Sequence, residues 1–161
     1  MNSAYALRKD ICEVGRRVYQ RGFVAANDGN ISVRMEENRV LSTPTGVSKG
    51  YLNEDMLSIC DMDGQQVAGS MKISSEIRMH LEIYKLRSDV FSVVHAHPPT
   101  ATGFAVAGIE LTQCVLPEVI VSSTMFGWSS RVARRCRLAC QGFTLIELLT
   151  VVAIIGVLAA V

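Results

Sequence analysis

The last 19 residues, from Phe143 to Val161, hold a single charged residue, Glu147. An α-helix needs about 20 apolar residues to cross a bilayer, so this segment is long enough to span a membrane. Four arginines stand shortly before it, between Arg131 and Arg137. The sequence therefore predicts two unlike parts: a soluble head, and a tail made of a basic flank and a membrane segment.

The charges divide at the same point. Residues 1–121 hold 12 Lys or Arg and 14 Asp or Glu, whereas residues 122–161 hold 4 Arg and 1 Glu. A formal net charge of +1 gives no basic face for nucleic acid, so no nucleic-acid partner is expected. We predict a domain over 1–121, a basic junction over 122–142 and a hydrophobic helix over 143–161.

The head carries the patterns of a mixed α/β domain. Asp63-Gly64 is typical of a hairpin turn, which indicates that the sheet is at least partly antiparallel. Ser74-Ser75 offers an N-cap for the helix that follows. Apolar periodicity and turn residues predict helices over 3–21, from Ser74-Ser75 to about 87, and over 100–107, and strands over 31–34, 39–42, 56–62, 65–68, 90–97 and 111–121.

A His-Ala-His sequence ends the strand predicted over 90–97. Residues i and i+2 of a strand point to the same side, so His95 and His97 can reach one metal ion while Ala96 turns into the core. Imidazole nitrogen suits zinc and similar metals. The alternative is that two histidines stand here by chance. The third histidine, His80, is interpreted as structural.

Ser74, Ser75 and Glu76 stand where the second helix is predicted to begin. Hydroxyls and backbone N–H groups at a helix N-terminus can bind an anion, and Glu76 could act as a general acid or base if it lies near the metal. An acidic residue in a first helical turn is also ordinary dipole chemistry.

Two loops of small and hydroxyl residues come earlier, Gly29-Asn30-Ile31-Ser32 and Thr43-Pro44-Thr45-Gly46. Such loops can surround a phosphate with backbone donors, although more often they are only turns. Neither loop matches a P-loop or a dinucleotide fingerprint.

These motifs, in this order and at these separations, resemble the class II aldolase/adducin family, and within it the L-fuculose-phosphate aldolase type. The resemblance covers about residues 5–121. It implies a three-layer α/β/α sandwich around a largely antiparallel sheet, here incomplete and followed by the C-terminal hydrophobic helix. It also implies assembly as a homo-tetramer.

The resemblance implies a role for each motif. His95 and His97 would bind Zn²⁺ or another divalent metal, and Glu76 would be the catalytic acid/base. The implied substrate is a sugar phosphate, cleaved to dihydroxyacetone phosphate and an aldehyde. The residues implied to surround its phosphate are Asn30, Ser32, Thr45, Gly46, Ser74 and Ser75. Relatives supply a third histidine ligand, whereas no histidine follows His97 here, so impaired activity is expected.

The tail has a resemblance of its own. Gly142, Phe143 and Glu147, behind an arginine-rich leader, are similar to the N-terminal segment of type IV prepilins and pseudopilins. In those proteins a peptidase cuts after the glycine. The positive-inside rule would keep the head in the cytoplasm and anchor the tail in the inner membrane.

Three functional hypotheses follow from these patterns. The first is an aldolase-type enzyme domain that is truncated and joined to a pilin-like tail. The second is a ribulose-phosphate 4-epimerase or another sugar-phosphate lyase of the same family. The third is a membrane-anchored, pilin-like protein that carries a passenger domain.

Overall fold

The structure is a computed structural model that describes residues 4–36 and 38–108. The predicted helices and strands within these ranges are present, with ends shifted by a few residues. The strand predicted over 111–121 and the hydrophobic helix over 143–161 lie outside the described residues. The elements are α1 Ala4–Gln20, β1 Asn30–Arg34, β2 Arg39–Ser42, η1 Lys49–Tyr51, η2 Glu54–Met56, β3 Ser58–Asp61, β4 Gln66–Ala68, α2 Ile77–Leu86, β5 Ser92–His95 and α3 Pro99–Val106, where η marks a 3-10 helix.

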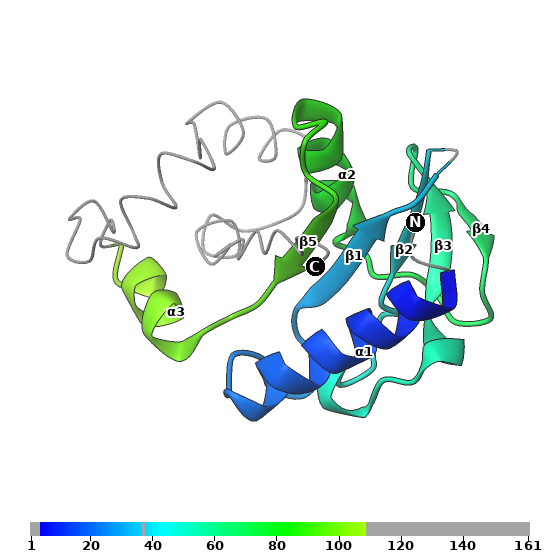
Figure 1. Cartoon of the computed structure of the whole chain (residues 1–161). Helices are drawn as coiled ribbons and strands as arrows, with labels where there is room; N and C mark the ends of the chain where they lie inside the picture. The colour runs from blue at the N-terminus through cyan, green and yellow to red at the C-terminus, as the bar shows by residue number, and fades with distance from the viewer. Residues whose placement is uncertain (1–3, 37, 109–161) are drawn as a thin grey trace.

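One five-stranded sheet organises the described residues, in the order β4-β3-β2-β1-β5 (Figure 1). Each recorded pairing between these strands is antiparallel. The predicted hairpin between β3 and β4 is confirmed: the Asp61 carboxylate accepts hydrogen bonds from the backbone N–H groups of Asp63 and Gln65, both at 2.9 Å. The fold is therefore mixed α/β with an antiparallel sheet, as expected.

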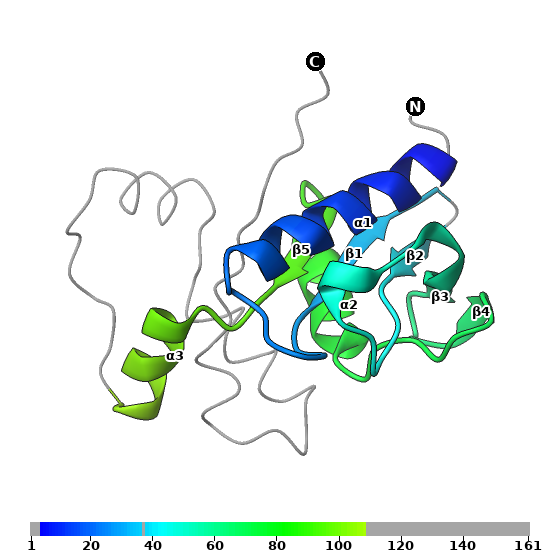
Figure 2. The same cartoon turned by 90° about the horizontal axis from the view of Figure 1, so that it is seen from below.

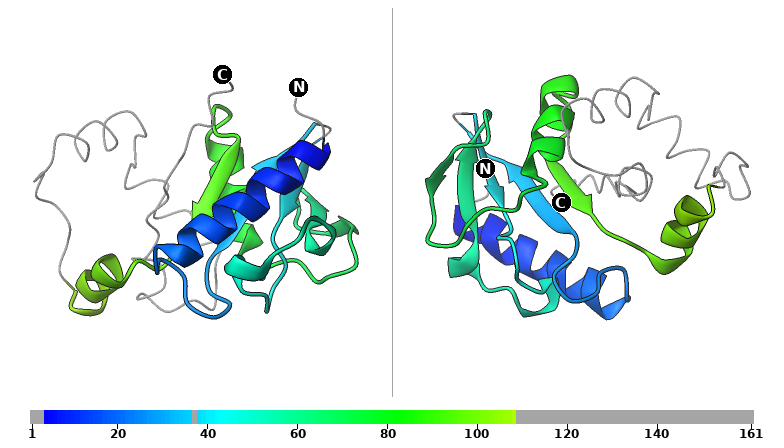
Figure 3. Two further views of the ribbon diagram at one scale, coloured as in Figure 1. Left: turned by 60° about the horizontal axis from the view of Figure 1, so that its bottom comes forward. Right: turned by 180° about the vertical axis from the view of Figure 1, so that it is seen from behind.

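Helix α1 covers one face of the sheet, as Figures 2 and 3 show. Its buried residue Ile11 packs with Ile31 and Val33 of β1 and Leu41 of β2. The helical spacing of apolar residues in α1 and the two-residue alternation in β1 meet at this contact. This face of the sheet is consequently an apolar core.

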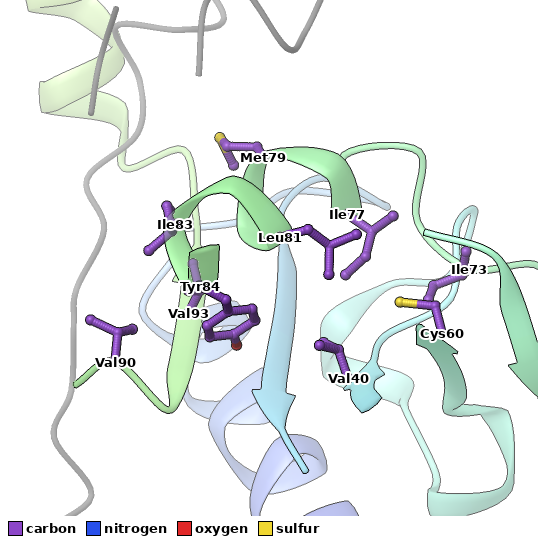
Figure 4. Packing of buried hydrophobic residues seen from close by; sticks show 10 residues of the cluster. All are labelled: Val40, Cys60, Ile73, Ile77, Met79, Leu81, Ile83, Tyr84, Val90 and Val93. Carbon is purple, nitrogen blue, oxygen red and sulfur yellow. The ribbon is translucent and has the colours of Figure 1, made fainter. Parts of the chain in front are cut away.

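Helix α2 covers the opposite face. Its residues Ile77, Leu81 and Tyr84 pack on Val40 of β2 and on neighbouring strands (Figure 4). The alternation along each strand separates the two cores, because Val40 faces α2 while the next residue faces α1. The beginning of α2 is thereby held against the sheet, next to the end of β5.

The predicted serine N-cap of α2 is wrong. The helix begins at Ile77 with Glu76 as its N-cap, and no side chain caps it. The Ser74 hydroxyl is used elsewhere, because it accepts hydrogen bonds from the Asn30 amide at 3.0 Å and from the Glu76 N–H at 3.3 Å. Ser74 therefore shapes the turn before the helix instead of capping it.

Helix α3 follows β5 after a short extended segment and stands away from the sheet in Figures 1 and 3. Among the helices of the described ranges, none has both the length and the apolar character that crossing a membrane requires.

Candidate metal centre

Three side chains with metal-binding atoms meet where β5 ends and α2 begins. Glu76, His95 and His97 each offer a ligand atom, and these atoms lie within 4.8 Å of one another. The two imidazole rings are 4.7 Å apart between centroids. Ala96, between them, is fully buried and packs with Val18. The arrangement predicted for His-Ala-His is thus present, although β5 itself ends at His95.

His95 is held in one orientation by two acceptors. Its Nδ1 lies 3.1 Å from the Asn30 Oδ1 and 3.3 Å from the Glu76 Oε2. An amide oxygen and an ionised carboxylate only accept hydrogen bonds, so we assign the proton of the neutral ring to Nδ1. The lone pair is then on Nε2, which is buried and has no hydrogen-bond partner among the described residues. An imidazole fixed in this way through its other nitrogen fits a metal ligand.

Asn30 connects this histidine to the turn before α2. Its side chain is fully buried, and it lies opposite His95 in the pairing of β1 with β5. Its carbonyl oxygen accepts from His95 while its NH₂ group donates to the Ser74 hydroxyl at 3.0 Å. Both ends of the amide are therefore used, and Asn30 acts here as an orienting residue.

Gly29 allows the close approach that this connection needs. Its φ is +65°, and a Cβ atom there would lie 2.5 Å from the His95 carbonyl oxygen. A side chain would push β1 away from the end of β5. Glycine at this position therefore brings Asn30 within reach of His95.

The electrostatics favour a charged carboxylate at Glu76. Burial alone raises its pKa, but the hydrogen bond donated by His95, together with positive charge nearby such as that of Lys49, holds the pKa below its ordinary value. Glu76 is therefore ionised at neutral pH and available as a metal ligand or as a base.

The Ser32 hydroxyl lies in the core, which differs from the phosphate contact expected for it. Its Oγ is 2.7 Å from the His80 Nδ1 and 2.8 Å from the Tyr84 hydroxyl, and the residue is fully buried. Complete burial, with a smaller contribution from His95, lowers the pKa of His80 to about 3. His80 is thus a neutral core histidine, in agreement with its structural interpretation.

The remaining residues of the two loops lie beside the metal corner, the place where Glu76, His95 and His97 meet. The Thr43 hydroxyl accepts from the Ile31 N–H at 3.1 Å, and Pro44 forms an isolated bridge with Ile73. The chain therefore leaves for Thr45 and Gly46 from a point next to Ser74. Thr45, Gly46 and Ser75 are exposed, whereas Asn30 and Ser74 are buried.

Sequence reasoning missed Lys49. Its side chain is buried, and its ammonium donates to the Val47 carbonyl at 2.6 Å and to the Asn27 carbonyl at 3.3 Å. Lysines are almost never fully buried unless they are paired, and a lysine in a polar loop is expected to be solvated. No local signal in the sequence separates it from an exposed lysine.

Two family patterns match the sequence. The one described as "Class II Aldolase and Adducin N-terminal domain" matches residues 9–132, which is more than half of the chain. The one described as "Prokaryotic N-terminal methylation motif" matches residues 137–161. The chain belongs to the class II aldolase and adducin family, and its end carries the methylation motif.

Named relatives carry out different reactions. The chain is 39% identical over 100 residues to the 3-oxo-tetronate 4-phosphate decarboxylase of Haemophilus influenzae, covering 62% of this chain and 47% of that protein. It is 34% identical over 120 residues to the L-fuculose phosphate aldolase of Methanococcus vannielii, covering 74% and 64%. The match therefore spans about half to two-thirds of these relatives.

A solved structure supports the same fold. The L-fuculose-1-phosphate aldolase of Thermus thermophilus superposes with a TM-score of 0.53 at 27% identity, over 66% of this chain and 52% of that one. The enzymes of the family are lyases that bind sugar phosphates and typically use a divalent metal. The donor set of Glu76, His95 and His97 fits such a metal.

Proposed function

We propose that the chain is a metal-dependent lyase that cleaves a phosphorylated hydroxy-ketone, similar to L-fuculose 1-phosphate, into dihydroxyacetone phosphate and an aldehyde. The observation that supports it most is the corner of Glu76, His95 and His97, in which the His95 Nε2 is buried without a hydrogen-bond partner among the described residues. Imidazole and carboxylate ligands suit Zn²⁺, which we propose as the metal.

His95, His97 and Glu76 would hold the ion. A divalent cation bound there supplies a Lewis acid for the negative charge that develops on the substrate oxygen when the carbon–carbon bond breaks. Asn30 holds the His95 ring through Nδ1, so the ligand nitrogen is oriented before the substrate arrives. Glu76, with its lowered pKa, accepts the proton of the substrate hydroxyl and returns it to the product.

The loops would bind the remote phosphate. We assign direct contact to the exposed Thr45, Gly46 and Ser75, and a supporting role to Asn30 and Ser74, which are hydrogen-bonded to each other. The Ser32 hydroxyl is left out because His80 and Tyr84 occupy it. Backbone N–H groups and hydroxyls are suitable donors to a phosphate. Binding the phosphate fixes the distance between the reacting carbon and Glu76, which converts binding into orientation.

Turnover is expected to be slow. Catalytic zinc sites usually have three protein ligands with one position open for substrate. Two imidazoles and Glu76 complete such a set only when Glu76 is a ligand, and the carboxylate is then less available as a base. We therefore expect measurable metal binding with weak catalysis.

The test uses the full chain loaded with Zn²⁺. Release of dihydroxyacetone phosphate from L-fuculose 1-phosphate is measured for the wild type, for Glu76→Gln and for the control Glu82→Gln, which also removes a carboxylate from the same part of the chain. Slow release that E76Q abolishes and E82Q retains supports the proposal. Equal rates in all three chains, or no release from any, contradict it.

Two other reactions on related substrates are tested in parallel. Decarboxylation of 3-oxo-tetronate 4-phosphate is favoured by the relative in Haemophilus influenzae. Epimerisation of a ribulose phosphate is the other reaction that the motifs allow. All three substrates carry a phosphate and a carbonyl, so the one that turns over fastest identifies the reaction at the same corner.

A second candidate function concerns the tail and rests on the methylation motif at 137–161. We propose three parts, a lyase-type domain over 1–121, a junction over 122–142 and a membrane anchor over 143–161, with the head in the cytoplasm. Co-expression with a prepilin peptidase followed by mass spectrometry tests it. Full-length chain in the membrane without the peptidase, and release of residues 1–142 by a cut between Gly142 and Phe143 with the peptidase, support the pilin-like function. Uncut chain in the soluble fraction contradicts it.

A further inference from the structure

One buried charge has no part in the proposed reaction. Lys49 lies in η1 with 1% of its surface exposed. Taking an ammonium group out of water is costly unless hydrogen bonds and opposite charges compensate for it. The partners of Lys49 therefore indicate what the residue does.

Its two recorded hydrogen bonds reach two different loops. The ammonium donates to the Asn27 carbonyl at 3.3 Å, in the loop that leads into Asn30. It also donates to the Val47 carbonyl at 2.6 Å, directly after Gly46. Lys49 thus connects the 27–30 loop, which leads into Asn30, with the 43–48 loop, which contains Thr45 and Gly46.

The same two loops border a cavity of about 620 Å³. Asn27 from the first loop and Gly46 and Ser48 from the second line it, together with Tyr19 and Tyr51. The separation of the two loops sets the width of this cavity. A bond from Lys49 to each loop fixes that separation.

The backbone of Lys49 is itself held firmly. A Cβ atom at Gly15 in α1 would lie 2.7 Å from the Lys49 carbonyl oxygen, and a Cβ at Gly50 would lie 2.4 Å from the Tyr19 ring. The two glycines let η1 pack closely against α1. The lysine is therefore anchored to a helix while its ammonium holds the loops.

The surrounding charges give the ammonium a second effect. Burial lowers the pKa of Lys49, while Glu76 and Asp28 act in the opposite direction and favour its charged form. The loops that would receive a phosphate dianion thus already lie near two carboxylates. A cation beneath the loops offsets their repulsion of an anionic ligand.

We infer that Lys49 is a positioning residue that ties the 27–30 and 43–48 loops into one anion-binding surface and supplies the positive charge beneath it. The inference rests on the proposed function for the identity of the ligand, but not for the tie between the loops. Lys49 does not contact the substrate in this account, because its side chain is buried below the loops.

The test compares four full-length chains: the wild type, Lys49→Met, Lys49→Gln and the control Lys85→Met, which removes an exposed lysine that pairs with Glu82. Hydrogen exchange of the backbone amides in 25–30 and 43–48 measures the tie. Titration of the Zn²⁺-loaded chain with inorganic phosphate, followed by ³¹P NMR, measures the anion-binding surface. Zn²⁺ affinity and the circular dichroism spectrum are recorded for each chain.

K49M is expected to raise exchange in both loops by about tenfold or more and to weaken phosphate binding by a similar factor, at unchanged Zn²⁺ affinity. K49Q keeps a donor but not the charge, so it is expected to retain more of the protection while still losing phosphate affinity. K85M should match the wild type in every measurement.

Amide exchange in K49M that is as slow as in the wild type overturns the inference. If K49M does not fold, K49Q decides instead, and unchanged amide exchange and phosphate affinity in K49Q overturn the inference. If the wild type binds Zn²⁺ but no phosphate, faster amide exchange in K49M still supports the conclusion that Lys49 holds the two loops together. In that case the assignment of phosphate to the loops fails, and with it that part of the proposed function.

Discussion

Helix α1 covers one face of the sheet and α2 covers the other, and both faces bury an apolar core, but β1 buries polar side chains only toward α2. Toward α1, β1 presents Ile31 and Val33 to an apolar core. Toward α2, the same strand presents Asn30 and Ser32, which are fully buried and hydrogen-bonded. One strand therefore stabilises the domain with one face and builds the candidate site with the other.

Buried polar groups are costly unless each is satisfied, so a polar row inside a core indicates a specific use. Here Ser32 bonds with His80 and Tyr84, while Asn30, two residues earlier on the same face of β1, bonds with Ser74 and with His95 of the metal corner. The apolar packing of α1 therefore contributes mainly stability, whereas the α2 side of the sheet contributes both an apolar core and, through the polar residues of β1, the geometry of the site. Substitutions on the two faces should separate these effects.

The largest effect is expected on the apolar face. Ile11→Ala removes a side chain that is 1% exposed and leaves a cavity, which should lower the free energy of unfolding by about 2–5 kcal/mol. Urea unfolding measures it. Zn²⁺ affinity of the folded chain should stay within about threefold of the wild type, and a much larger loss would show that the two faces are not separate.

On the polar face, Ser32→Ala should cost about 1–3 kcal/mol, because it leaves the buried His80 Nδ1 and Tyr84 hydroxyl without this partner. Phosphate affinity should not change, since the Ser32 hydroxyl is buried and is already bonded to His80 and Tyr84. Ser75→Ala, at an exposed serine before α2, is the control for stability. A tenfold loss of phosphate affinity in S32A, at wild-type stability, would show that Ser32 contacts the phosphate as first expected.

Asn30→Ala should weaken Zn²⁺ binding by about tenfold to hundredfold, because His95 loses the acceptor that orients it. Isothermal titration calorimetry at fixed pH measures this loss. Ser32→Ala, at the next position on the same face of β1, should bind Zn²⁺ as the wild type does. Equal affinity in N30A and the wild type would mean that Glu76 alone orients the ring.

The smallest effect near neutral pH is a pH dependence that belongs to His80. Its pKa is about 3 in the fold, below the ordinary value of 6.5, so the unfolded chain binds a proton that the native chain rejects. This contribution to stability is complete above pH 6.5 and is lost as the pH falls toward 3, by at most about 1.4 kcal/mol per pH unit. Urea unfolding at pH 7, 6 and 5 should show the loss in the wild type and a smaller one in His80→Gln. If the free energy of unfolding depends on pH in the same way in both chains, His80 is not the group responsible.

Local patterns predicted most of the fold, because the periodicity of α1, the alternation of β1 and the Asp63-Gly64 turn are properties of short segments. They also predicted which residues share a side at His95 and His97. They did not predict how deep a side chain lies, and so Ser32 was expected at the site when it lies under α2. Lys49 was missed for the same reason, since its burial depends on α1 and two distant loops.

The central claim is that the end of β5 and the start of α2 form a metal site, and titration of the full chain with Co²⁺ tests it most directly. The wild type should bind one ion with the visible absorption bands of low-coordinate Co²⁺, and Zn²⁺ should displace it. His95→Ala should lose these bands, whereas His80→Gln, which removes an imidazole from the core, should keep them. Absence of bands in the wild type, or unchanged bands in H95A, would contradict the account.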